Sequence, residues 1–178
     1  MQHQLLAQYI NNAHTANDRA EYSIAVGWCK QALQLTSDLP QAWYNLSVAL
    51  DGLGKRPEAI DALKRARILT LNSADAQNSI GLQFIELGAY LEAEQCLNQS
   101  IELAPDYAFP YSNLGKLREK QKRLEDAAAL FRKAIELQPN LALVHANLGG
   151  ILNTQKDYGA AEAACRKAIE LDAKSPEA

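Results

Sequence analysis

Hydrophobic residues recur along this chain at spacings of three and four, the spacing with which one face of an α-helix meets its neighbours. Residues 108–141 show it most clearly, because a first helical segment contains Asn113-Leu114-Gly115 and Pro139-Asn140 ends a second one. The hydrophobic stripe of the second segment is Leu124, Ala127, Phe131, Ala134, Ile135 and Leu137. The pattern predicts two helices joined by a short turn.

The same two-helix pattern returns at a fixed interval of 34 residues. The positions that show it are Ala25, Ala59, Ala93, Ala127 and Ala161, together with Leu35, Leu69, Leu103, Leu137 and Leu171. A fixed interval is expected where like units stack and each touches its neighbour in the same way. We therefore predict a single all-α array over residues 1–178. Its units are 6–39 (degenerate), 40–73, 74–107, 108–141 and 142–175, and 176–178 begins a further, truncated unit.

The residues at these positions resemble the tetratricopeptide repeat. In the fourth unit they are Tyr111, Leu114-Gly115, Ala127, Phe131, Ala134 and Pro139. Other units depart from the family pattern: Ser47 replaces the glycine, and Gln77 and His145 replace the aromatic residue. The resemblance implies an α-solenoid, a right-handed superhelix of about five antiparallel two-helix units, whose first helices line a concave groove.

The resemblance also implies which residues line that groove. The sixth position of successive units is Asn11, Asn45, Ser79, Asn113 and Asn147, which is similar to the asparagine ladder of O-linked N-acetylglucosamine transferases. An amide offers a donor and an acceptor to a peptide backbone. The other peptide-binding candidates are Tyr44, Asn78, Leu82, Phe109 and Lys116. The alternative is that these asparagines are ordinary exposed helix residues. If they bind a partner, replacing Asn45, Asn113 and Asn147 by alanine should weaken binding without lowering the melting temperature.

Composition excludes several classes of partner. The formal net charge of −3 leaves no basic surplus for nucleic acid, and the chain has no apolar run long enough for membrane insertion. Residues 1–10 lack the features of a secretion signal. Cys29, Cys96 and Cys165 lie about two repeats apart, so we expect three buried free thiols and a cytoplasmic location.

No catalytic constellation is apparent. His3, His14 and His145 fall in different units, no His/Cys spacing suits zinc, and Gly52-Leu53-Gly54 ends a helix instead of forming a phosphate loop. We therefore expect neither enzymatic activity nor a cofactor or metal. The predicted function is a protein–protein interaction module that binds an extended peptide or a partner helix in the concave groove.

Two alternatives to this function stay open. The last unit lacks a polar capping helix, so the chain could be a self-assembling scaffold that forms a homo-oligomer through this unit. The chain could also be the substrate-recruiting arm of a larger transferase. Pro176-Glu177-Ala178 matches the start of another unit, as in Pro40-Gln41-Ala42, so we expect a segment of a longer chain.

Overall fold

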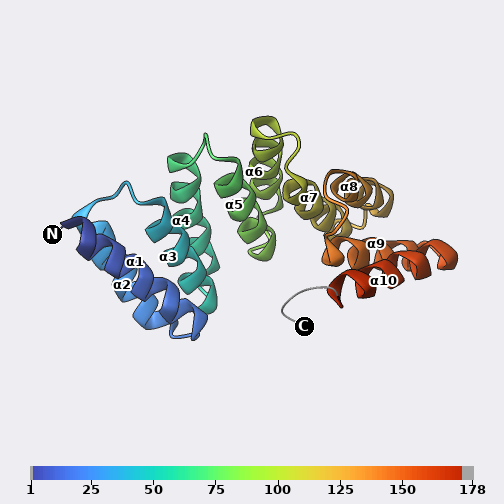
Figure 1. Ribbon diagram of the computed structural model, residues 1–178. Helices are drawn as coiled ribbons and strands as arrows, with labels where there is room; N and C mark the ends of the chain where they lie inside the picture. Colours follow the sequence, from blue (N-terminus) through green and yellow to red (C-terminus); the bar gives the residue numbers. More distant parts are fainter. Residues whose placement is uncertain (1, 174–178) are drawn as a thin grey trace. The chain divides into compact units, whose positions relative to one another are not determined.

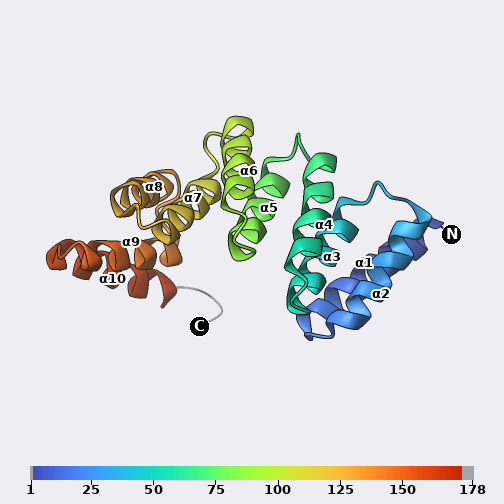
Figure 2. The ribbon, with the colours of Figure 1, turned by 180° about the vertical axis from the view of Figure 1, so that it is seen from behind.

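The computed structural model describes residues 2–173, and within them it contains ten α-helices and no strand (Figure 1). The helices are α1 (Gln2–Asp18), α2 (Tyr22–Leu35), α3 (Pro40–Gly52), α4 (Arg56–Leu69), α5 (Ala74–Glu86), α6 (Tyr90–Leu103), α7 (Ala108–Lys120), α8 (Leu124–Leu137), α9 (Ala142–Thr154) and α10 (Tyr158–Asp172). Helices lie side by side in consecutive pairs, as α1 with α2 and α9 with α10 in both Figure 1 and Figure 2. The predicted all-α architecture of two-helix repeats is confirmed.

The chain forms two compact units, residues 1–99 (unit 1) and 100–178 (unit 2), and the boundary falls within α6. In unit 1, α1 packs on α2 and α3, and α3 packs on α4. In unit 2, the core gathers Phe131 of α8 with Leu148 and Ile151 of α9. The single array across residues 1–178 stays a prediction, and the expected start of another repeat at 176–178 lies outside the described residues.

The turn inside each helix pair repeats its backbone geometry every 34 residues. Each of the five turns contains one residue with a positive φ: Ala20 (56°), Gly54 (73°), Gly88 (77°), Lys122 (63°) and Lys156 (66°). Around Gly54, its N–H donates to Asp51 O at 2.7 Å and the Lys55 N–H donates to Leu50 O at 2.8 Å. These bonds satisfy the last carbonyls of α3. They require a residue in the left-handed backbone conformation, which glycine adopts most readily.

Small residues in the first helix of a pair allow the second helix to approach closely. A Cβ at Gly81 would lie 2.8 Å from Leu97 Cγ, and one at Gly115 would lie 2.8 Å from Phe131 Cε1. The buried Ser47 occupies the equivalent position in the preceding repeat. The Leu-Gly step of the sequence pattern is therefore a packing requirement, because a larger side chain would collide with its partner helix.

One side chain in each of three repeats ties the first helix to the turn that precedes it. The contacts are Trp43 Nε1 to Ser37 O (2.8 Å), Tyr111 Oη to Pro105 O (3.0 Å) and His145 Nε2 to Pro139 O (2.9 Å). A carbonyl oxygen only accepts hydrogen bonds, so Nε2 of His145 must carry a proton. The ring-bearing side chains at this repeat position therefore also hold the preceding turn through a hydrogen bond from their polar atoms.

Gln77, the apparent exception to the aromatic pattern, serves the same purpose. Its side chain is fully buried, and Nε2 donates to Arg67 O at 3.2 Å and to Thr70 O at 3.1 Å. Nε2 also lies 3.4 Å from Thr70 Oγ1, whose hydroxyl donates to Ala66 O. An amide therefore holds the turn between α4 and α5 where the other repeats use a ring.

One expectation about the cysteines is wrong. Cys29 and Cys96 are buried and carry free thiols, as expected, but Cys165 is exposed. Cys165 lies on α10 and faces α9, where its Sγ would be 2.6 Å from a Cβ at Gly149, and it lines an open pocket between these two helices. Burial within a repeat needs a neighbour on each side, and periodicity alone does not say which neighbours are present.

Candidate functional site

The main candidate site is an open cleft of about 380 Å³ in unit 1. Three first helices line it, and the end of α4 adds one residue. The lining residues are Ile10, Asn11 and His14 of α1, Pro40, Gln41, Tyr44 and Asn45 of α3, Thr70, and Asp75, Ala76, Ser79 and Ile80 of α5. The cleft therefore runs across three consecutive repeats of unit 1.

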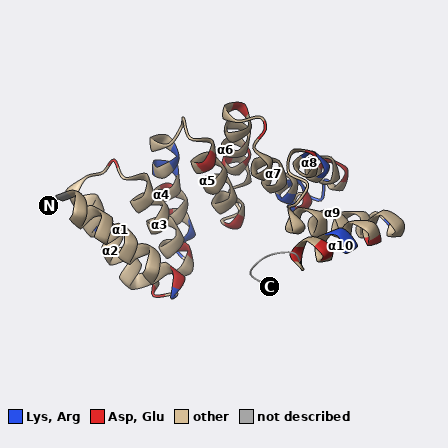
Figure 3. Cartoon of the chain, viewed as in Figure 1, with Lys and Arg blue, Asp and Glu red and all other residues tan. Residues whose placement is uncertain are grey.

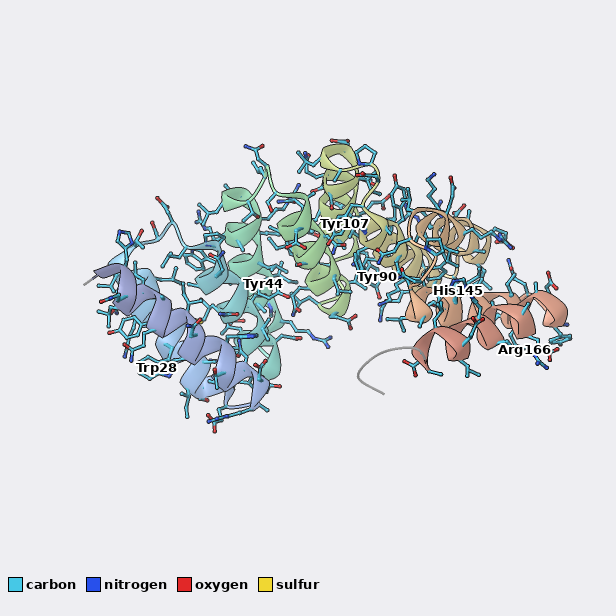
Figure 4. The ribbon with its side chains drawn as sticks, in the orientation of Figure 1. Trp28, Tyr44, Tyr90, Tyr107, His145 and Arg166 are labelled. Atoms are coloured by element: carbon cyan, nitrogen blue, oxygen red, sulfur yellow. The ribbon has the colours of Figure 1, made fainter. Side chains whose placement is uncertain are left out.

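The lining of this cleft is mainly apolar, with polar groups set into it. Ile10 and Tyr44 are half-buried, and Ile80 is fully buried. Tyr44, labelled in Figure 4, adds an aromatic ring and a hydroxyl, and burial raises the pKa of that hydroxyl above its usual value. The phenol therefore stays neutral well beyond neutral pH and can both donate and accept. Such a mixture suits a ligand with apolar side chains and a polar backbone.

Asn45 has a structural duty beside any role in binding. It is 8% exposed, and its Nδ2 donates to Ile10 O at 3.4 Å, while its own backbone carbonyl accepts from Asn17 Nδ2 at 3.0 Å. Both bonds join α3 to α1. Replacing the Asn45 side chain would remove the bond to Ile10 O, whereas the bond from Asn17 to the backbone carbonyl of residue 45 would remain. We therefore expect Asn45→Ala to lower stability by about 1 kcal/mol, contrary to the expectation from sequence.

The structure brings four of the ten predicted peptide-binding residues into this cleft: Asn11, Tyr44, Asn45 and Ser79. Asn78 and Leu82, also on α5, are not among its lining residues; Asn78 is buried and Leu82 is half-buried.

The other four predicted residues belong to unit 2. Phe109 is 43% exposed and packs edge-on against Tyr107, with ring centroids 5.5 Å apart. Asn113 is 7% exposed, whereas Lys116 and Asn147 are half-buried. Nδ2 of Asn147 is buried and has no hydrogen-bond partner among the described residues. Asn45, Asn113 and Asn147 thus lie deeper than a row of exposed amides would, whereas Asn11 is exposed.

Sequence reasoning missed several residues of the cleft. Gln41 and Asp75 are 34 residues apart and occupy the same position in successive repeats, so the repeat period could have identified both as lining residues. His14 lies one helical turn after Asn11 and faces Asp18, with 3.6 Å between its Nε2 and the carboxylate. Thr70 carried no such signal, because it follows α4 and reaches the cleft only through the chain's return to α5.

The described residues hold no group of three or more His, Cys, Asp or Glu side chains that could bind a metal ion. None of the helices in the described part of the chain is both long enough and apolar enough to cross a bilayer.

Comparisons with known proteins identify the repeat. Sequence models of the tetratricopeptide repeat match residues 40–66, 72–140 and 112–176. Comparison with curated protein sequences gives no match.

Solved structures share the fold. PilF of Pseudomonas aeruginosa aligns with a TM-score of 0.80 at 20% identity, over 95% of this chain and 77% of that one. MamA of Desulfovibrio magneticus RS-1 aligns with a TM-score of 0.74 at 23% identity, over 97% of each chain. YrrB, described as a tetratricopeptide-repeat protein with an unusual peptide-binding site, aligns with a TM-score of 0.64 at 22% identity, over 93% and 86%.

Proposed function

Because this chain belongs to the tetratricopeptide-repeat family, we propose that it is a protein-interaction module whose unit 1 cleft holds an extended segment of a partner protein. The main support is the meeting of Asn11, Tyr44 and Ser79 in one cleft with an apolar floor. Its volume of about 380 Å³ lies within the range of roughly 300–1,000 Å³ that is usual for ligand sites.

The mode of binding follows from the lining. Apolar side chains of the segment would rest on Ile10 and the ring of Tyr44, and the backbone would exchange hydrogen bonds with Asn11 and Ser79. An extended segment suits this arrangement because its backbone donors and acceptors are not satisfied internally, unlike those of a helix. YrrB, which has the same fold, is itself described as having a peptide-binding site.

The test uses short randomised peptides displayed on phage, selected against the whole chain. Gln41 is exposed and lines the cleft, so Gln41→Trp should occlude the cleft without disturbing the core. Gln31→Trp is the matched control, since Gln31 is exposed on α2 and lies away from the cleft. We expect the selected peptides to bind the wild-type chain and Gln31→Trp equally, and to lose most of their affinity for Gln41→Trp. Peptides that bind all three proteins alike would refute the proposal, as would a selection that yields no binders.

Self-association of the last hairpin is a second candidate. Leu143, Tyr158 and Ile169 of α9 and α10 are 62%, 64% and 70% exposed, so this hairpin presents apolar side chains that a second copy could cover. Light scattering over a range of protein concentrations tests it, and a mass that stays at one chain throughout would exclude it.

A further inference from the structure

Within the helices of unit 1, Lys and Arg occur only on the second helix of a pair, although the second helices also carry carboxylates such as Glu58 and Asp61 of α4. The first helices α1, α3 and α5 carry four carboxylates, Asp18, Asp51, Asp75 and Glu86, and contain no Lys or Arg. The cations of the helices in this unit lie on the second helices, as Lys30 of α2 and Arg56, Lys64, Arg65 and Arg67 of α4. In Figure 3, α1 is almost entirely tan and blue lies on α4.

Two of the four cations of α4 contact the next second helix, α6. Lys64 Nζ lies 3.1 Å from Glu92 Oε1, and Arg67 Nη1 donates to Gln95 Oε1 at 2.9 Å. Both bonds link α4 to α6, and a backbone hydrogen bond, followed by the Lys64 contact, lowers the pKa of Glu92. Arg56 reaches Asp51 at 3.5 Å and so offsets one of the four inner carboxylates. The first helices have no Lys or Arg of their own, and Asp75 places a carboxylate in the lining of the cleft.

The helix N-termini near the cleft do not make its lining favourable for anions. The N-termini of α3 and α5 both reach the cleft, and helix N-termini normally favour anions. Here Pro40 removes one N–H from the first turn of α3, and Asp75 already places a carboxylate in the first turn of α5. An acidic ligand would therefore meet a like charge and no Lys or Arg among the residues that line the cleft.

We propose, on the basis of the function proposed above, that the cleft selects extended segments that carry Arg or Lys among apolar residues. The aliphatic part of an Arg or Lys side chain packs on apolar surface while its end stays polar. The cleft offers both surfaces, because Ile10 and the ring of Tyr44 supply apolar area and Asp75 lies in the same lining. The partner is thus a protein with a cationic, partly apolar, extended segment.

The experiment is the same phage selection, run in parallel on the wild-type chain, Asp75→Asn and Asp61→Asn. Asp61 is the matched control because it is exposed on the second helix α4 and does not line the cleft. We expect binders of the wild type and of Asp61→Asn to be enriched in Arg and Lys at a shared position, and binders of Asp75→Asn to lack this enrichment. Replacing that cation by Gln in a synthesised binder should weaken its affinity for the wild type about three- to tenfold, as removal of one charged contact does.

The outcomes separate this inference from the function on which it rests. Binders that depend on the cleft but show no cationic enrichment, or keep it with Asp75→Asn, would overturn the charge selection and leave the peptide-binding function standing. Enrichment in Asp or Glu would overturn it as well. If no binder is sensitive to Gln41→Trp, the proposed function itself falls.

Discussion

Replacing Gln77 tests whether one buried amide holds the turn between the second and third helix pairs. Gln77→Leu keeps most of the side-chain volume but removes the donor that serves Arg67 O and Thr70 O. Both carbonyls keep a backbone N–H donor, from Thr70 and Ser73, so the variant loses two hydrogen bonds but leaves neither acceptor unpaired. At about 0.5–1.5 kcal/mol for each bond, and with the buried Oε1, which has no partner among the described residues, also removed, we expect a loss of about 1–2 kcal/mol in the free energy of unfolding of unit 1. An exposed Gln on α2 supplies the control, since Gln31→Ala should change stability by less than about 0.5 kcal/mol.

Gln77→Glu adds a test that depends on pH. An ionised carboxylate has no donor and would face two carbonyl oxygens, so we expect it to destabilise unit 1 more than Gln77→Leu at neutral pH. Burial and these carbonyls favour the protonated carboxyl, so its pKa should rise above the usual value of about 4.3. A raised pKa makes the protonated state the stabilising one, and stability relative to wild type should recover as the pH falls through it.

The assay can report unit 1 alone. The chain has two tryptophans, Trp28 and Trp43, and both lie in unit 1, so urea unfolding followed by their fluorescence follows the unit that contains Gln77. Circular dichroism at the same urea concentrations reports both units. The reasoning would be refuted if Gln77→Leu unfolded at the wild-type midpoint, or if Gln77→Glu were as stable as wild type at neutral pH.

Two further predictions concern helix packing and the thiols. Gly115→Ala should cost about 1–3 kcal/mol, because the new Cβ would lie 2.8 Å from Phe131, whereas Gly150→Ala, with no atom within 4 Å, should be neutral or stabilising in thermal unfolding. A smaller loss for Gly115→Ala than for Gly150→Ala would contradict the packing argument. Burial raises the pKa of Cys29 to about 12 and that of Cys96 to about 11, so a thiol reagent at pH 8 should label Cys165 quickly and the other two only on unfolding. Fast labelling of the folded Cys165→Ser variant would contradict the burial of Cys29 and Cys96. Because the folded-state pKa values of these two thiols are raised, their contribution to stability is present below the ordinary thiol value of 9.0 and is lost as the pH rises toward 11 and 12.

The repeat period could be predicted from the sequence because each unit meets its neighbours through the same positions. Gly115 and Phe131 show why, since a small residue and a large one must face each other wherever two helices of a pair cross. The turn geometry follows the same period, although only Gly54 and Gly88 reveal it by residue type, and Lys122 adopts the same conformation. Local requirements that recur are therefore written into the sequence as spacing.

The candidate site depended on contacts that spacing does not contain. The sequence alone placed Asn45 among the groove residues, but its burial and its bond to Ile10 O arise from how closely α3 approaches α1. Gln77 looked like a departure from the pattern until its three acceptors were visible. Thr70 lines the cleft and Cys165 is exposed. Both facts depend on the arrangement of the neighbouring helices, which residue spacing does not contain. Periodic sequence thus determined the repeating helix pair, whereas tertiary packing decided which polar groups are used internally and which are left for a partner.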